Sequence, residues 1–449
     1  MKRILLFILL ALTSGMFFSC LKSQEDVFDE PSAIRLQKLI RAYKDTLAAS
    51  ENGWIMQYYP IPSKDFGGLD YWLKFDNDQN VSVYTNLNIS DGSVKSSLYD
   101  IIPERGPVLT FNTYNDILHY FTTPSSKYYQ GYQSDYEFVI ESYEDGIFTL
   151  VGKIYGNKMY LIRLGDSKTP QDYLNNVANN SYRLIRGDFN CTTEEGTAMY
   201  FESSSKVNFR YLDGEDTVVV TKPFALTDDG IDLNTPVEFN GHSMRRFKVD
   251  YSDGSYVCTD KGQEDMRFEY DHPDTYVKYE DLIGDYYCVC GMLMFDIDGQ
   301  PVEHLDSIRC TFRQAEDKRY LIASGLVQVP KESSTGSTPE YVDADIKIKY
   351  DPFFGTFGMI SQLIDEKSKL CMLGYQRTWG FGESFFITYF SDGKGHYVGD
   401  SSYSTAARLG MFYVSDINFN STVNIKQALN CWRCLDNSGS FTIVRWTKI

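Results

Sequence analysis

Short segments of alternating residue type, separated by turns, recur through most of this 449-residue sequence. In one of them Tyr71, Leu73 and Phe75 alternate with Trp72 and Lys74. This is the period-two pattern of a strand that buries one face. Gly, Asp and Asn residues stand between the segments as turn formers. Strands at this spacing predict antiparallel β-sandwiches or barrels and disfavour a parallel α/β sheet.

The amino-acid composition also favours a mainly β fold. The sequence contains 34 Tyr and 29 Phe residues, and aromatic residues make up 15% of it. Aromatic and β-branched side chains fit the half-buried, pleated surface of a sheet. The chain is longer than one typical domain, so we expect two or three domains.

Two helices are expected in addition to the strands. Ser32 is the predicted N-cap of the first helix, which runs to about Ala49 and stops before Gly53. Its apolar face at helical spacing comprises Leu36, Leu39, Ile40, Tyr43 and Leu47. Thr169 followed by Pro170 predicts the start of a second, shorter helix, because proline is favoured in a first helical turn.

Changes of pattern divide the chain into segments. The expected boundaries are 1–19 for a signal peptide, 20–31 for a tether, 32–258 for the N-terminal helix and a β-rich domain with a sub-boundary near 165–185, 259–280 for a linker, and 281–449 for a C-terminal β domain. The linker is predicted because its residues are charged and only weakly periodic. The C-terminal domain resembles a lipocalin-like barrel or a sandwich.

The N-terminus has the pattern of an export signal. Lys2 and Arg3 are followed by an apolar run over residues 4–18, which suits a signal peptide better than a membrane-spanning helix. Ser19 directly precedes Cys20, and this arrangement resembles the lipobox of bacterial lipoproteins, although the two phenylalanines before Ser19 depart from its commonest form. The resemblance implies cleavage before Cys20 and acylation of this cysteine. The alternative is an ordinary secretory peptide with an incidental cysteine.

The residues after Cys20 refine the expected location. Glu25 and Asp26 follow it closely and resemble the surface-export signal of Bacteroidota lipoproteins. That resemblance implies a lipid anchor in the outer membrane and exposure at the cell surface. The alternative is a plain polar linker.

The net charge argues against one class of partner. The formal charge is −18 at pH 7, and an acidic surface repels the phosphate backbone and gains nothing from counterion release. We therefore expect no nucleic-acid partner.

Eight cysteines remain besides the predicted lipidation site, and most are expected to be buried thiols that behave as small hydrophobic residues. Cys288 and Cys290 are two residues apart, and Cys431 and Cys434 form a C-x-x-C. Structural thiols are the favoured interpretation of both pairs. The alternatives are a local disulfide or redox role at the C-x-x-C, or a zinc site if the two pairs meet.

No catalytic or cofactor motif is found. Residues 76–80 imitate the first half of a calcium loop, but Val81 and Leu87 occupy the positions where an EF-hand needs Gly and Glu. We expect no cofactor and assign no metal ligand. Calcium binding by another loop is the alternative. The five histidines are isolated, and no H-E-x-x-H, G-x-S-x-G or P-loop occurs. Missing motifs argue only weakly against hydrolysis, because glycosidase carboxylates lie far apart in sequence.

Two loops rich in aromatic residues are the candidate ligand-binding sites. They span 126–132 and 375–383, and the candidate residues are Tyr128, Tyr129, Tyr132, Arg377, Trp379 and Phe381. An aromatic face on a glycine-bearing loop can stack against a sugar ring or a peptide side chain. The alternative is that these aromatic residues pack down as caps on the ends of a barrel.

Several N-terminal segments together resemble one family. They are 25–28 (EDVF), 50–54 (SENGW), 71–75 (YWLKF), 109–115 (LTFNTYN), 118–121 (LHYF) and 135–139 (DYEFV). Over residues 20–163 the chain is similar to Bacteroidota lipoproteins that carry the domain of unknown function 4302. The family has no established activity and no catalytic residues to transfer. Its members tend to accompany TonB-dependent transporters of the starch-utilisation type and their surface-lid lipoproteins.

These observations and the resemblance predict a surface-exposed outer-membrane lipoprotein. Its expected role is to bind a glycan or an oligopeptide, without catalysis, for a TonB-dependent transporter and the transporter's surface-lid lipoprotein. One alternative is a glycosidase or peptidase of the same system. The other is an adhesin or structural subunit.

Overall fold

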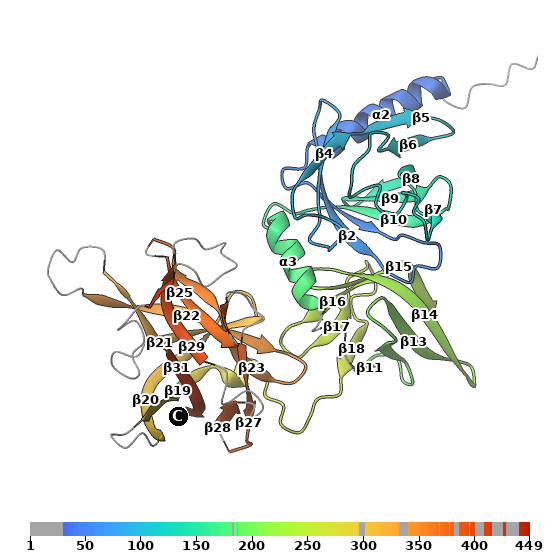
Figure 1. Cartoon of the computed structure of the whole chain (residues 1–449). Coiled ribbons are helices and arrows are strands. Elements are labelled where there is room, and N and C mark those ends of the chain that lie inside the picture. Colours follow the sequence, from blue (N-terminus) through green and yellow to red (C-terminus); the bar gives the residue numbers. More distant parts are fainter. Residues whose placement is uncertain are drawn as a thin grey trace, which may run out of the picture.

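The computed structural model describes residues 30–181, 184–185, 187–295, 301–331, 340–367, 369–376, 378–380, 386–394, 396–399, 408–414, 425–427 and 440–449. Figure 1 shows three β units that follow one another along the chain. An open sheet comes first, a closed barrel lies below it, and the C-terminal unit lies to the left. All pairings between named strands are antiparallel within the described residues, so the mainly β prediction with an N-terminal helix is confirmed. No helix in these ranges is long and apolar enough to span a membrane.

The first unit is a half-barrel of nine strands in the order β4-β3-β2-β1-β10-β9-β8-β6-β5. Its elements are α2 (Ser32–Ala48), β1 (Trp54–Tyr58), β2 (Leu69–Phe75), β3 (Asn80–Tyr84), β4 (Lys95–Leu98), β5 (Asp100–Pro103), β6 (Pro107–Thr110), β7 (Tyr129–Tyr132), β8 (Glu137–Glu144), β9 (Ile147–Gly152) and β10 (Lys158–Arg163). The strand β7 lies outside this sheet, in the long connection between β6 and β8.

Helix α2 packs against the core of the half-barrel through part of its predicted apolar face. Ile40 and Leu47 are buried in this core, and the indole nitrogen of Trp54 donates a hydrogen bond of 2.9 Å to the carbonyl of Leu47. Leu39 was expected on the same face but is 39% exposed. The N-cap prediction is wrong by one residue, because the extended Pro31 precedes the helix and Ser32 is already helical.

All five residues of β1 are buried. Trp54 and Met56 face the main core of the half-barrel. Ile55 faces a second cluster with Leu174 of α3 (Pro170–Asn180). Both faces of the strand are therefore covered, and its one polar residue, Gln57, is buried as well. The start of α3 is as predicted, and the Thr169 hydroxyl accepts a hydrogen bond from a backbone N–H in the first turn.

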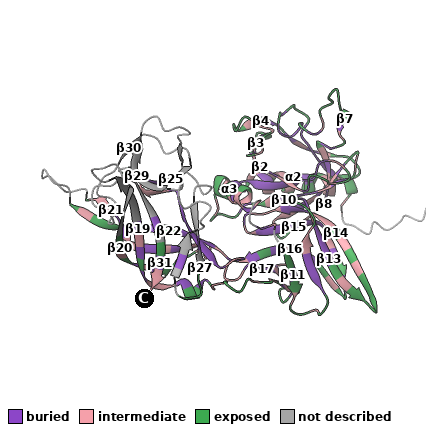
Figure 2. Cartoon of the chain, turned by 60° about the horizontal axis from the view of Figure 1, so that its bottom comes forward, coloured by how far each residue is buried: buried purple, intermediate pink, exposed green. Residues whose placement is uncertain are grey.

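The second unit is a closed barrel of eight consecutive strands. They are β11 (Asp188–Cys191), β12 (Ala198–Phe201), β13 (Lys206–Asp213), β14 (Asp216–Leu226), β15 (Gly230–Phe239), β16 (His242–Asp250), β17 (Ser255–Cys258) and β18 (Arg267–Tyr270). Figure 2 shows buried residues along the barrel strands and exposed residues along the projecting β13–β14 hairpin.

The strand β18 corrects the predicted linker over 259–280. It pairs with β11 and β17 and thereby closes the barrel. Phe268 is buried inside, whereas Arg267 points outward and pairs with Asp250 and Asp253. A charged residue of the predicted linker therefore belongs to the outer face of a barrel strand.

The described residues of the C-terminal unit form thirteen strands. They are β19 (Gly284–Phe295), β20 (Pro301–Gln314), β21 (Tyr320–Pro330), β22 (Tyr341–Asp351), β23 (Thr356–Ile360), β24 (Gln362–Asp365), β25 (Leu370–Gln376), β26 (Thr378–Gly380), β27 (Phe386–Ser391), β28 (His396–Gly399), β29 (Arg408–Val414), β30 (Ile425–Gln427) and β31 (Ser440–Lys448). A 3₁₀ turn, η2 (Glu280–Leu282), precedes them. The strands β19–β23, β27, β28 and β31 form a closed barrel, because β31 also pairs with β19.

The turn between β22 and β23 joins the C-terminal unit to the central barrel. Phe353 in this turn is 1% exposed and belongs to the core of the central barrel. Its ring centroid lies 6.1 Å from that of Phe189 and 5.6 Å from that of Tyr270. The core of the central barrel is therefore completed by a side chain from the C-terminal unit.

Replacing Phe353 with Ala should destabilise the central barrel by about 3–5 kcal/mol, the usual range for truncating a buried phenylalanine. Urea unfolding of the full chain measures this loss. Val219→Ala on β14 is the control, because Val219 is half exposed and its truncation should have little effect. A loss below about 1 kcal/mol for Phe353→Ala would show that the barrel does not depend on this contact.

Candidate functional site

The connection between β6 and β8 carries exposed aromatic side chains. Tyr129 is 81% exposed, and Tyr128 is exposed beside it. Tyr132 is half-buried, and its ring centroid lies 4.5 Å from that of Tyr128 and 5.3 Å from that of the buried Phe121. Tyr132 therefore packs down on the half-barrel, whereas Tyr129 projects into solvent.

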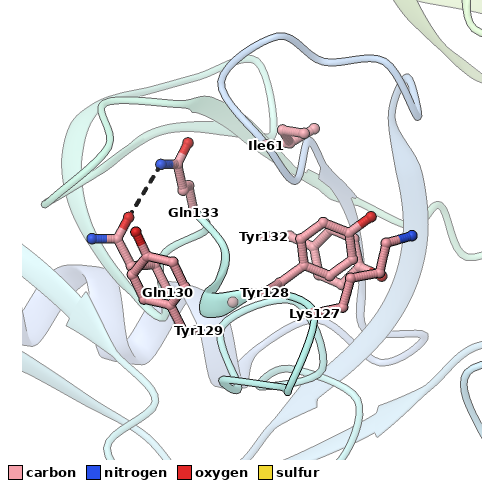
Figure 3. A pocket seen from close by; sticks show the side chains of 8 residues that line it. Ile61, Lys127, Tyr128, Tyr129, Gln130, Tyr132 and Gln133 are labelled. Carbon is pink, nitrogen blue, oxygen red and sulfur yellow. Dashed lines mark hydrogen bonds between the residues drawn. The ribbon is translucent and has the colours of Figure 1, made fainter.

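These residues enclose a cavity of about 250 Å³. Figure 3 shows Tyr129, Gln130 and Gln133 on one side, Tyr128 and Tyr132 on the other, and Ile61 across from the loop. The amide of Gln133 donates a hydrogen bond of 3.5 Å to Gln130. The site thus places aromatic rings on two sides and amide groups on one of them. Such a lining can stack against a flat ring and hydrogen-bond its polar edge.

Gly131 gives the loop its shape. Its φ is +61°, and its N–H donates to the carbonyl of Tyr128 at 2.9 Å. A Cβ atom at this position would lie 2.7 Å from the carbonyl oxygen of Thr122. Only glycine fits this approach without a shift of the backbone, so Gly131 fixes the neighbouring tyrosines.

A second loop contributes Ile61 to the opposite side of the cavity. This loop, residues 61–67 between β1 and β2, has non-glycine residues in the left-handed region at Ile61 (φ 61°) and Lys64 (φ 55°). Gln133 on the first loop has the same conformation, with φ 54°. Left-handed backbone is unusual for a β-branched residue such as isoleucine and tends to occur at functional sites.

The central barrel holds this second loop in place. Lys206 Nζ contacts the carboxylate of Asp65 at 2.8 Å, and the Ser205 hydroxyl donates to the Asp65 carbonyl at 2.9 Å. At the end of the loop, the N–H of Gly68 donates to the carbonyl of Phe224 at 2.9 Å. The two walls of the cavity therefore have different supports: one rests on the half-barrel and the other on the barrel.

A second cavity, of about 300 Å³, lies at the seam between the half-barrel, α3 and the central barrel. Ile55, Tyr173, Asp228, Asp232 and Phe247 are among the residues that line it. It combines apolar walls with carboxylates from the start of β15. Cavities of this kind at domain junctions are common ligand sites.

Buried carboxylates cluster behind and around this seam cavity. The amide of Gln57 donates to Asp232 at 2.7 Å, and Lys168 pairs with Asp228 at 2.5 Å. Burial raises the pKa of both aspartates. Burial, and then the charge of Asp232, raise the pKa of Asp70 well above its ordinary value. Burial thus shifts the pKa of all three aspartates upward.

Comparison with known proteins gives one match. A family model described as Domain of unknown function (DUF4302) covers residues 24–251, which is just over half of the chain. The chain belongs to this family. No curated protein and no solved structure matches it.

The DUF4302 region contains the whole half-barrel and the central barrel through β16. Both loops of the aromatic cavity and the seam cavity fall mainly inside it. The last two barrel strands, β17 and β18, lie beyond its end. The DUF4302 region thus includes both candidate cavities but does not by itself include a complete barrel.

The sequence-predicted site residues are only partly described. Tyr128, Tyr129 and Tyr132 line one cavity, as stated above. Five further predicted residues lie outside the described ranges: Cys20, Glu25, Asp26, Arg377 and Phe381. The backbone of Trp379 pairs with Tyr375 between β25 and β26.

Sequence reasoning missed Ile61 and Gln133, which line the aromatic cavity. It also missed Phe66, whose ring centroid lies 5.8 Å from that of Tyr132. A signal existed in the turn-rich stretch after Pro60, where a lone phenylalanine stands among polar residues and glycines. The seam aspartates could not be found in this way, because carboxylates are abundant throughout the chain.

In the part of the chain that the structure describes, no group of three or more His, Cys, Asp or Glu residues is placed to hold a metal ion. The carboxylate of Asp76 instead accepts hydrogen bonds from the N–H groups of Asp78 and Asn80, at 2.9 and 2.8 Å. The Sγ atoms of Cys288 and Cys290 lie 3.6 Å apart in the C-terminal core, well beyond the length of a disulfide bond.

Asp70→Asn should make the protein more stable at pH 8, by about 1 kcal/mol or more. A carboxyl whose folded-state pKa is raised stabilises the fold when protonated, and this stability falls as the pH rises above the unfolded pKa of about 4. The asparagine variant lacks this loss, so the difference from wild type should shrink toward pH 4. Thermal unfolding across pH measures it.

Asp78→Asn is the matched control, because Asp78 is exposed in the β2–β3 turn. It should leave the pH dependence unchanged. Equal pH dependence in wild type and Asp70→Asn would contradict a buried, proton-binding Asp70.

Proposed function

We propose that this protein is a surface-exposed, acylated outer-membrane lipoprotein that binds a ligand for a neighbouring TonB-dependent transporter. Its partners would be that transporter and the transporter's surface-lid lipoprotein, in an organism of the Bacteroidota. The lipobox-like Ser19–Cys20 and the early Glu25 and Asp26 support the anchor and its location. Membership of the DUF4302 family supports the context. The proposed role is capture of a glycan or an oligopeptide without chemical change.

The observation that carries the binding role is the exposure of Tyr129 beside a cavity. A tyrosine that is 81% exposed contributes little to packing, and a large exposed ring on a shaped loop is typical of a recognition surface. Tyr128 and Tyr132 supply further ring surface around the same cavity. A ligand bound there would bury these rings.

The position of the anchor fits this role. Cys20 and the first described residue, Glu30, are ten positions apart, and ten residues reach at most about 35 Å. Acylation at Cys20 would therefore hold the half-barrel close to the membrane. Tethering of this kind raises the effective concentration of a binding protein near its membrane partners.

A hydrolase of the same nutrients is the second candidate, and the seam cavity is the observation that favours it. Asp228 and Asp232 line that cavity with pKa values raised by burial, as a general acid requires. Turnover of a glycan or peptide that is abolished in Asp232→Asn would favour this candidate. An adhesin or structural subunit would instead bind the transporter stably without any ligand.

Cys20→Ala should release the protein from the outer membrane or misdirect it, because a chain without the acylated cysteine has no lipid anchor. Membrane fractionation and labelling with a fatty-acid analogue measure this outcome. Ser19→Ala is a suitable control, because a small residue still precedes the cysteine. A Cys20→Ala protein that stays at the surface like the wild type would contradict the lipoprotein proposal.

Tyr129→Ala should weaken ligand capture by about tenfold without loss of stability, because its ring is 81% exposed. A binding screen of residues 21–449 against glycans and oligopeptides measures this. Tyr287→Ala on β19 is the control, since Tyr287 is also exposed but lies in the C-terminal unit. No binding to either ligand class, together with no transporter complex, would refute the proposed function.

A further inference from the structure

We infer that the ligand of the aromatic cavity is an uncharged glycan chain, and that Phe66 on the second loop extends the site so that it holds several sugar units. This inference rests on the proposed function, because it names the ligand class and a further contact residue for the same site. It assigns a role to the loop over residues 61–67, which the sequence did not mark as a binding element.

The chemistry of the lining favours an uncharged ligand. Among the described residues that line the cavity, Lys127 alone is charged. Its ammonium group lies 5.0 Å from the ring centroid of Tyr128. The remaining polar side chains are the amides of Gln130 and Gln133 and the tyrosine hydroxyls. These groups donate and accept hydrogen bonds without charge, as sugar hydroxyls require. The lining contains no carboxylate to pair with a cationic ligand.

Phe66 extends the aromatic surface beyond the cavity. It is 46% exposed, and its ring centroid lies 5.8 Å from that of Tyr132. Tyr132 in turn contacts Tyr128 at 4.5 Å. The three rings therefore form a continuous row from one loop to the other. A row of rings offers more than one stacking position, which suits a chain of sugar units better than a single sugar.

The row is held before any ligand arrives. Phe66 packs on the buried Phe121 with ring centroids 5.8 Å apart, and the contact between Lys206 and Asp65 fixes the adjacent loop residue. Gly131 fixes the tyrosine loop, as described above. Because the rings need little ordering on binding, less of the interaction energy is lost to entropy. The left-handed conformations of Ile61 and Gln133 are consistent with loops shaped for a ligand.

Titration calorimetry with the chain over residues 21–449 tests the inference. The probes are neutral glucans, mannans and xylans of two and of six units, polygalacturonate as an anionic chain, chitosan oligomers as cationic chains, and a hexapeptide library. At least one neutral six-unit chain should bind, and more tightly than its two-unit form. Tyr129→Ala should weaken both lengths by about tenfold.

Variants of Phe66 test the extension of the site. Phe66→Ala should weaken binding of the six-unit chain by about tenfold, with the two-unit chain unchanged within about twofold. Phe66→Tyr should retain the long-chain advantage because it keeps the ring, whereas Phe66→Leu should lose it. Tyr287→Ala is the control for general loss of an exposed ring. Unfolding temperatures of the variants separate loss of contact from loss of fold.

The outcomes distinguish this inference from the proposed function. Phe66→Ala with wild-type affinity for the six-unit chain would overturn the extended site. Preference for polygalacturonate that disappears in Lys127→Ala would overturn the uncharged class, and so would preference for chitosan. Peptide binding that depends on Tyr129 would overturn the inference but leave the proposed capture role intact. No binding of any probe would overturn this inference, and it would refute the proposed function as well if no transporter complex formed.

Discussion

The seam between the half-barrel and the central barrel determines where the candidate binding surface lies. At its centre, the amide of Gln57 donates to the buried Asp232, and the Tyr160 hydroxyl donates to the carbonyl of Asn234 at 2.8 Å. Gly68 bridges to Ala225, and a Cβ on Gly68 would lie 2.5 Å from the Ala225 side chain. Both ends of the loop over residues 61–67 are thus attached to strands of this seam. The barrel fixes one wall of the aromatic cavity, although every tyrosine of the cavity comes from the half-barrel.

The contacts that join the half-barrel to the central barrel include polar groups whose burial costs free energy. A buried carboxylate is tolerated when it is hydrogen-bonded, paired or protonated, and Asp232, Asp228 and Asp70 show these solutions side by side. Arg245, whose guanidinium lies 4.0 Å from the ring centroid of Tyr160, adds a cation–π contact across the same junction. An apolar seam could slide, whereas directional hydrogen bonds specify one arrangement. The buried carboxyl groups can therefore be explained by a structural role at the seam, as well as by the hydrolase alternative proposed above.

Sequence patterns predicted much of this molecule, and their failures have physical causes. Period-two alternation in β2 located a real strand with Tyr71, Leu73 and Phe75 buried. The charged segment over residues 259–280 was wrongly predicted to be a linker. It contains β18, which directs Arg267 outward and Phe268 inward. Aromatic density identified the loop with Tyr129, since a local segment supplies most of that wall. Phe66 escaped notice because its partner Tyr132 is far away in sequence, and only the tertiary fold brings their rings together.

We infer that this protein holds a neutral glycan against the row of rings from Phe66 to Tyr128, together with Tyr129. The most direct measurement is a crystal structure of residues 21–449 with the tightest-binding six-unit neutral oligosaccharide. We expect density for sugar rings against Tyr129 and Tyr132, continuing toward Phe66, with sugar hydroxyls near Gln130 or Gln133. A bound chain located elsewhere, for example in the seam cavity beside Asp232, would contradict it.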